Sequence, residues 1–186
     1  MKPTIEIRAF DMLNPREEDV PYTQMICFHR RYHLGDDHTF KSEDYSGWSA
    51  MERDIIKKLK PAFIAPLYMY DHSAVDIATS YQPYWWHARW DAGQIGFIVV
   101  RKKEARELAK LYGRPLTEQD FQDIVEGELK EYVKYLNGWQ EYDYVIKDAN
   151  TDEILDYGGS GYDSEEDARR DGEAHIKILE QEEVNA

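Results

Sequence analysis

Groups able to do chemistry gather in the segment from Cys27 to His38, CFHRRYHLGDDH. It holds the only cysteine of the chain, three of its six histidines and two aspartates. Imidazole and carboxylate groups are common ligands of zinc and iron. On a helix His29 and His33 would share a face, whereas on a strand they would lie about 13 Å apart at roughly 3.3 Å per residue, too far for one ion. A metal site and a polar turn over Leu34–Asp37 are the two interpretations, and we expect the turn, without a metal.

A second polar cluster, from Tyr70 to Ser73, contains an Asp-His-Ser run. Neighbouring residues of a strand point to opposite faces, so this run alone does not form a catalytic triad. If the chain were an enzyme, the two clusters together would favour a small metal-dependent hydrolase. Its candidate catalytic residues would be His29, His33, Asp36, His38, Asp71 and His72. Cys27 lies between Ile26 and Phe28 and is interpreted as a small buried side chain rather than a nucleophile.

Aromatic residues crowd the stretch from Tyr81 to Asp91. Trp, Tyr and Arg are enriched at binding hot spots, so this stretch is a second candidate for an interaction surface. Its central residues are Trp85, Trp86 and Trp90. The alternative is that these rings complete a core beside the apolar run Gln94–Val100, and both interpretations stay open at this point.

These groups need a scaffold, and the apolar patterns predict an α+β fold with a mixed, mainly antiparallel sheet packed by helices. Strands are expected at Thr4–Phe10, Tyr22–Tyr32, Phe63–Tyr70 and Gln94–Arg101. Helices are expected over Trp48–Leu59, with Ser46 or Ser49 as the cap, and over Lys103–Tyr112, with Gly113 closing it. Pro66 inside the third of these strands predicts a bulge or an edge position.

The C-terminal part of the chain has the pattern of a helix, a hairpin and a second helix. Thr117 is expected to cap the first helix, which ends at Gly138 and carries one apolar stripe. The stripe is expected to face a sheet that contains Gln94–Val100, and it consists of Phe121, Ile124, Val125, Leu129, Val133 and Leu136. The segments Tyr142–Ile146 and Glu153–Tyr157 predict the hairpin. Ser164 is expected to open the last helix, whose acidic first turn suits the helix dipole.

Charge is distributed unevenly along the chain. At 186 residues we expect the chain to form a single domain over 1–186, or one domain with a small appendage. The net charge is −14. Residues 1–116 hold 16 acidic and 17 basic residues, whereas residues 117–186 hold 21 acidic and 6 basic residues. We therefore expect a near-neutral scaffold over 1–116 and an acidic part over 117–186 that attracts basic partners. The alternative is that acidic helices only make the protein soluble.

The cellular setting follows from what the sequence lacks. One cysteine excludes an internal disulfide framework, and charges interrupt every apolar segment, so neither a signal peptide nor a membrane span is expected. These features favour a cytoplasmic protein that binds neither membranes nor nucleic acid directly. We expect no cofactor.

Several segments resemble a family of uncharacterised proteins of bacteriophages and other mobile elements. The matching segments are CFHRRYHLGDDH, PLYMYDHS, WDAGQIGFIVV, KKEARELAKLYG and EGELKEYVKYLNG, which run in order from about residue 27 to about 160. Related sequences often have serine where this chain has Ala92, and a Cys-Trp pair where it has Tyr157, Gly158 and Gly159, so chemistry that needs that serine or cysteine is not expected here. The resemblance implies a phage-like setting in a bacterial host, in which small acidic proteins are often inhibitors of host defence.

The function that we expect is therefore that of an inhibitor or interaction protein that presents an acidic face to a basic, DNA-handling host protein, as anti-CRISPR or anti-restriction proteins and DNA mimics do. The expected partner-binding residues are Glu118, Asp120, Asp123, Glu126, Glu131, Asp163, Glu165, Glu166, Asp167 and Asp171. In this interpretation CFHRRYHLGDDH is structural. Arg30 and Arg31 would pair with carboxylates among Asp36, Asp37, Asp71 and Asp91.

Overall fold

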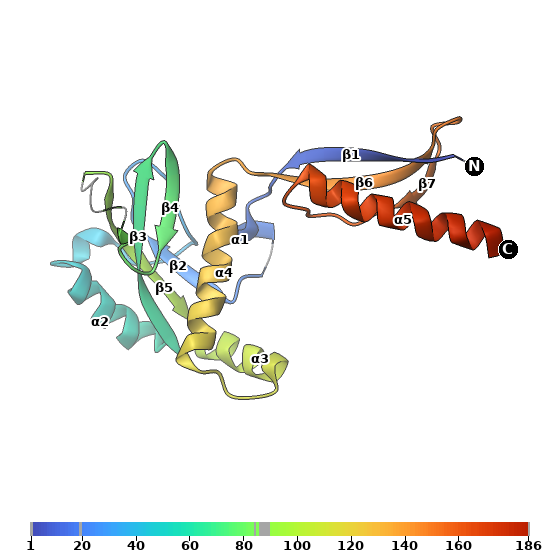
Figure 1. Ribbon diagram of the computed structural model, residues 1–186. Coiled ribbons are helices and arrows are strands. Elements are labelled where there is room, and N and C mark those ends of the chain that lie inside the picture. Colours follow the sequence, from blue (N-terminus) through green and yellow to red (C-terminus); the bar gives the residue numbers. More distant parts are fainter. Residues whose placement is uncertain (1, 19, 84, 86–89, 186) are drawn as a thin grey trace. The chain divides into compact units, whose positions relative to one another are not determined.

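The computed structural model describes residues 2–18, 20–83, 85 and 90–185, and the chain forms two compact units (Figure 1). Unit 1 consists of Met1–Met12 and Gly138–Ala186, and unit 2 of Leu13–Asn137. Along the chain, unit 2 is therefore an insertion between the first strand of unit 1 and the rest of that unit. The charge boundary expected near residue 116 does not coincide with the boundaries of the two units, which lie after Met12 and after Asn137. The expected α+β class is confirmed, because antiparallel sheets pack against helices in both units.

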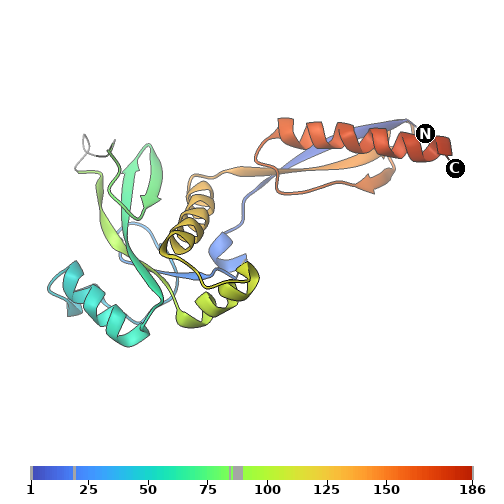
Figure 2. The same ribbon diagram turned by 60° about the horizontal axis from the view of Figure 1, so that its bottom comes forward.

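Unit 2 is built on a four-stranded antiparallel sheet with the order β2-β5-β3-β4. Its strands are β2 (Thr23–Cys27), β3 (Phe63–His72), β4 (Ala74–Ala78) and β5 (Ala92–Val100). Its helices are α1 (Pro15–Glu18), the 3-10 turn η1 (Ser42–Asp44), α2 (Trp48–Leu59), α3 (Lys102–Tyr112) and α4 (Glu118–Leu136). Figures 1 and 2 show α2 and α4 on opposite sides of the sheet.

Both faces of this sheet are buried, which explains the unbroken apolar run in β5. Ile98 and Val100 belong to the core cluster shared with α4, whereas Phe97 and Val99 belong to the cluster shared with α2. Successive strand residues point to opposite faces, so a strand covered on both sides needs apolar residues at every position. The prediction that the stripe of α4 faces this strand is confirmed, since all six stripe residues pack in the first cluster.

Capping patterns in the sequence predicted two helix ends of unit 2 correctly. Thr117 forms a capping box with Asp120, and Gly113 closes α3 in the left-handed conformation, as predicted. The predicted serine cap of α2 is wrong: the N-cap is Gly47, without a side-chain cap bond. The bulge expected near Pro66 is present one residue later, where the register of β3 shifts between Leu67 and Tyr68.

Unit 1 is a three-stranded antiparallel sheet, ordered β1-β6-β7, with one long helix. Its elements are β1 (Pro3–Asp11), β6 (Gln140–Asp148), β7 (Ile154–Tyr157) and α5 (Glu165–Asn185). The predicted hairpin is confirmed as β6 and β7. Its core of Tyr144, Ile146 and Ala168 is small, and partly buried side chains such as Ile5 and Ile7 of β1 complete it. Ser164 caps α5, because its Oγ accepts the backbone N–H of Asp167 at 3.1 Å.

None of the helices in the part of the chain that the structure describes has both the length and the apolar character needed to cross a membrane.

Candidate functional site

The segment CFHRRYHLGDDH leaves β2 and turns back along the outer edge of that strand. The strand predicted over Tyr22–Tyr32 therefore ends at Cys27. Asp36 takes the place of a neighbouring strand: its backbone N–H donates to the Met25 carbonyl at 3.0 Å, and its carboxylate accepts the Met25 N–H at 2.7 Å. His38 Nε2 donates to the Cys27 carbonyl at 3.1 Å. Residues that looked like metal ligands thus satisfy the backbone of an exposed sheet edge.

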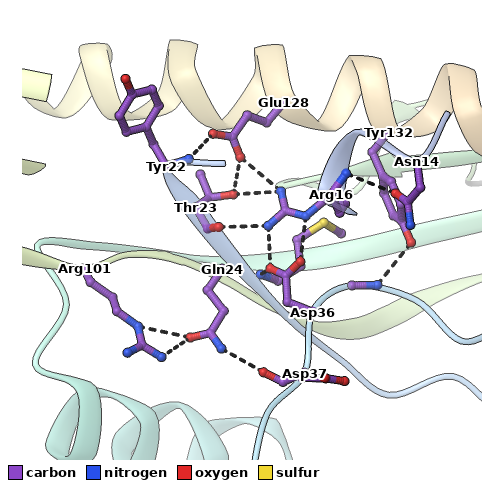
Figure 3. A network of polar contacts seen from close by, with 12 residues as sticks. Asn14, Arg16, Tyr22, Thr23, Gln24, Asp36, Asp37, Arg101, Glu128 and Tyr132 are labelled. Atoms are coloured by element: carbon purple, nitrogen blue, oxygen red, sulfur yellow. Dashed lines mark hydrogen bonds and ion pairs between the residues drawn. The ribbon is translucent and has the colours of Figure 1, made fainter. Parts of the chain in front are cut away.

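A buried arginine completes this edge, and Figure 3 shows its contacts. The Arg16 side chain is only 3% exposed. Its guanidinium donates to Asp36 Oδ1 at 2.9 Å, to the Thr23 carbonyl at 2.8 Å and to Glu128 Oε2 at 3.0 Å. Burial alone would lower the pKa of Arg16, but the two carboxylates outweigh burial and raise the pKa. The network joins α1, β2 and α4, and no pattern in the sequence indicates Arg16 or Glu128 as its members.

The close approach of this loop to β2 depends on Gly35. Its φ is +75°, and a Cβ atom there would lie 2.7 Å from the Met25 carbonyl oxygen. The Gly35 N–H donates to the Tyr132 hydroxyl at 3.1 Å, which ties the turn to α4. A residue with a side chain would be strained in this conformation and would push the loop away from the strand.

Cys27 has the environment of an inert thiol. Its side chain is buried, and burial raises its pKa to about 12. A nucleophilic cysteine needs a lowered pKa and an adjacent base. The interpretation of Cys27 as a small buried side chain is confirmed.

The tip of the segment lies near the end of β3 and carries the remaining polar groups. Arg31 forms an ion pair with Asp71, as one of the expected pairings proposed, whereas Asp36 is held by Arg16 instead. The His29 ring stacks on Tyr32 with centroids 5.1 Å apart. Burial and then the charge of Arg31 lower the pKa of His29. This favours neutral imidazole at the tip.

The residues of the hydrolase alternative make different contacts, although four of them line one hollow of unit 2, namely His29, His33, Asp36 and His38. Asp36 and His38 serve the edge of β2, Asp71 pairs with Arg31, and His72 Nδ1 lies 3.4 Å from Asp91 Oδ2. The described residues include no group of three or more His, Cys, Asp or Glu side chains that could hold a metal ion.

Two hollows flank the tip of the segment and share Phe28, His29 and Arg30 in their walls. One has a volume of about 640 Å³ and reaches Trp48, and the other has a volume of about 420 Å³ and reaches Trp90. Ligand pockets often have volumes of roughly 300–1,000 Å³, but their walls are mainly apolar, whereas charged and histidine side chains line much of both hollows. Both hollows therefore lie beside His29.

The aromatic candidates divide into different environments. Trp85 is fully buried and stacks on Tyr70 with centroids 6.0 Å apart, so it belongs to the core. Trp90 is fully exposed. Trp86 lies outside the residues that the structure describes. Of the two that are described, Trp90 is therefore the one that a partner could reach.

The expected acidic residues also divide, five on α4 in unit 2 and five in unit 1. Several of them make local contacts: Asp120 binds Arg114 and the N-cap, Glu131 binds Lys134, and Asp171 accepts the hydroxyl protons of two tyrosines. Glu118, Asp123 and Glu126 of α4 and Glu165 and Glu166 of α5 are exposed. The ten residues therefore do not form one continuous surface within either unit.

The two units differ strongly in net charge. Unit 1 holds 17 acidic and 6 basic residues, a net charge of −11, whereas unit 2 holds 20 acidic and 17 basic residues, a net charge of −3. Most of the −14 of the chain thus belongs to the smaller unit. The acidic part expected over 117–186 is divided between the two units, because α4 lies in unit 2 and the rest of that part lies in unit 1.

The chain matches no protein-family model, no curated protein and no solved structure.

Proposed function

We propose that the chain is a phage-type inhibitor or interaction protein whose unit 1 presents an acidic surface to a basic, DNA-handling host protein of the bacterial cytoplasm. The observation that carries this proposal is the net charge of −11 on unit 1. Like charges gathered on a small body reinforce each other's potential and accelerate encounter with a basic partner. The phage setting and the inhibitor role come from the sequence resemblance.

The chemistry of the surface suits a partner that normally binds DNA. Duplex DNA carries one negative charge per roughly 1.7 Å of its axis, so a protein that competes with it needs closely spaced carboxylates. Unit 1 has such spacing at the start of α5, where Glu165, Glu166 and Asp167 follow Asp163. Asp152 at the tip of the hairpin is 86% exposed and adds to the same unit. Carboxylates on both the helix and the hairpin support binding to a basic channel.

Charge reversal within each unit tests the proposal. One variant changes Glu165, Glu166 and Glu173 of α5 to lysine, and the matched control changes Glu118, Asp123 and Glu126 of α4 to lysine. All six side chains are exposed, so the fold should survive in both variants. The measurement is capture from a bacterial lysate, followed by titration of the captured protein against each variant over a range of salt concentrations.

The α5 variant should lose binding, and the α4 variant should keep most of it. Binding of the unaltered chain should weaken steeply as salt rises, because exposed charge pairs are screened. Equal binding by the α5 variant and the unaltered chain would refute the proposal. If Trp90→Ala were then the change that abolished binding, the site would lie beside the histidine-rich tip of unit 2.

A further inference from the structure

The strand β1 has one edge that no strand covers among the residues that the structure describes. β1 pairs with β6 along its whole length, from Pro3 opposite Asp148 to Asp11 opposite Gln140, and it is the outermost strand of its sheet (Figure 1). Its register is free of bulges. A long, regular edge strand is a template for pairing with another chain.

The contacts at both ends of β1 show which backbone groups point outward. Ala149 N–H donates to the Lys2 carbonyl at 2.9 Å, and Met12 N–H donates to the Trp139 carbonyl at 3.2 Å. Hydrogen-bonded and non-hydrogen-bonded pairs alternate along an antiparallel ladder. The backbone N–H and C=O groups of the even-numbered residues of β1 therefore point towards β6. The N–H and C=O groups of Ile5, Ile7 and Ala9 therefore point away from the sheet.

These outward groups are self-complementary about Ile7. If a second copy of β1 lies antiparallel with Ile7 opposite Ile7, then Ile5 lies opposite Ala9, and each of these pairs can form two hydrogen bonds. In the same register Glu6 lies opposite Arg8 of the second copy, and Arg8 lies opposite Glu6 of the second copy. Opposite charges at such directly facing positions stabilise an antiparallel pair.

We propose that the outer edge of β1 is a self-association surface, on which two copies of the chain pair about a two-fold axis at Ile7 to form one six-stranded sheet. A second copy is the occupant because backbone register and side-chain charge agree on one self-complementary alignment. This proposal rests on β1 and not on the acidic surface of unit 1.

The charge of the units limits the strength of this dimer. Each copy of unit 1 carries a net charge of −11, so the two copies repel each other over the Debye length of about 8 Å at physiological salt. We therefore expect a reversible dimer, whose mass rises with concentration from the 22.0 kDa of the monomer towards twice that value. Sedimentation equilibrium measures this directly.

Charge reversal on β1 separates the dimer contact from contacts within one chain. Glu6→Arg places two arginines opposite each other, and Arg8→Glu places two glutamates opposite each other, so each variant alone creates two like-charge pairs across the axis. Each should weaken dimerisation about tenfold or more. Within the chain, Glu6 binds Lys147 and Arg8 binds Asp143, and both pairs are partly exposed, so neither variant should unfold unit 1.

Mixing the two variants gives the decisive result. A heterodimer of one Glu6→Arg chain and one Arg8→Glu chain has opposite charges at both positions, although its pairs with Lys147 and Asp143 are still lost. The mixture should therefore dimerise when neither variant does so alone. A mixture that stays monomeric, or an unaltered chain that stays monomeric at every concentration, would overturn the proposal.

Proline tests the backbone part of the same contact. Ala9→Pro removes an N–H that points away from β6, so it should leave the β1–β6 ladder intact and block one hydrogen bond on each side of the axis. Ala9→Val is the matched control, because it keeps the N–H and suits a strand. Loss of the dimer in the proline variant alone supports the proposal, and equal dimerisation of both variants contradicts it.

Discussion

Each unit has an edge strand whose outer backbone groups point away from its sheet, and the two units differ in what binds these groups. In unit 2 the outer edge of β2 is covered by Asp36, His38 and Arg16, which bind its outward carbonyl and N–H groups. In unit 1 the outer edge of β1 has no such cover among the described residues. An edge closed by side chains belongs to a self-sufficient scaffold, whereas an open, self-complementary edge is available to a partner. The difference favours a structural role for unit 2 and an interaction role for unit 1.

The largest effect should come from removing the cation that closes the edge of unit 2. Arg16→Met would leave the carboxylates of Asp36 and Glu128 partly buried without their counter-charge, so the free energy of unfolding of unit 2 should fall by about 3–5 kcal/mol. Urea denaturation measures this loss. The Cys27 thiol gives a second readout, because it should react with thiol reagents faster as unit 2 opens more often.

Arg101→Met is the matched control for this prediction. Arg101 is exposed and donates to Gln24 on the surface of the same unit, so its loss should cost no more than about 1 kcal/mol. If both variants lost equal stability, the comparison between a closed and an open edge would no longer rest on Arg16.

A smaller effect of similar origin is expected at the turn that brings Asp36 to β2. Gly35→Ala should destabilise unit 2 by about 1–3 kcal/mol, because alanine is strained at a φ of +75° and its Cβ would crowd the Met25 carbonyl. Gly127→Ala on α4 is the control with the opposite sign. Apart from the adjoining residues and the backbone of the helix itself, no atom lies within 4 Å of a Cβ there, so helix stability should rise by up to about 1 kcal/mol. Thermal denaturation should show a lower melting temperature for Gly35→Ala and a higher one for Gly127→Ala.

The smallest effect concerns unit 1 and depends on pH. The hydroxyl of Tyr162 and then that of Tyr144 donate to the Asp171 carboxylate and lower its pKa. A carboxylate with a lowered pKa stabilises the fold above its unfolded pKa of about 3.9, and this contribution is lost as pH falls through the folded pKa. Asp171→Asn should therefore be less stable than the unaltered chain near neutral pH, with a difference that shrinks in acid.

Urea midpoints over a pH series measure this difference. Asp152→Asn is the control, since Asp152 is 86% exposed at the hairpin tip, where its carboxylate lies 3.4 Å from Lys147 Nζ. Near neutral pH its urea midpoint should lie closer to that of the unaltered chain than the midpoint of Asp171→Asn does. A difference for Asp171→Asn that grew as the pH fell would contradict the assignment of its charged form to the folded state.

Local patterns in the sequence predicted most elements, because their causes are local. The stripe of α4, the cap at Thr117 and the closing glycine at position 113 depend on residues within a few positions of each other. The cap of α2 failed for a local reason, since a glycine with positive φ starts that helix and neither serine serves. For Trp85 the sequence supported a core position and a surface position equally, and the structure shows that it is buried.

Contacts distant in sequence left no such signal. Arg16 and Asp36 are 20 positions apart, and either carboxylate of the Asp36-Asp37 pair could have served other partners. The sequence does not indicate the division into two compact units, because β1 pairs with a strand near the other end of the chain, and alternation in each strand says nothing about its partner. The sequence boundary by charge consequently assigned α4 to the acidic part.

The insertion of unit 2 into unit 1 has a consequence for the order of folding during synthesis. Arg8 and its partner Asp143 are separated by 135 residues, so β1 leaves the ribosome long before β6 exists. Unit 2 is continuous in sequence and can fold in the interval, as domains generally fold in units. Until β6 arrives, β1 is unpaired on both edges, and its alternating charges at Glu6 and Arg8 reduce the risk of premature association with unrelated strands. We therefore expect native pairing in unit 1 to be the last step of folding, because β6 follows the whole of unit 2 in the chain.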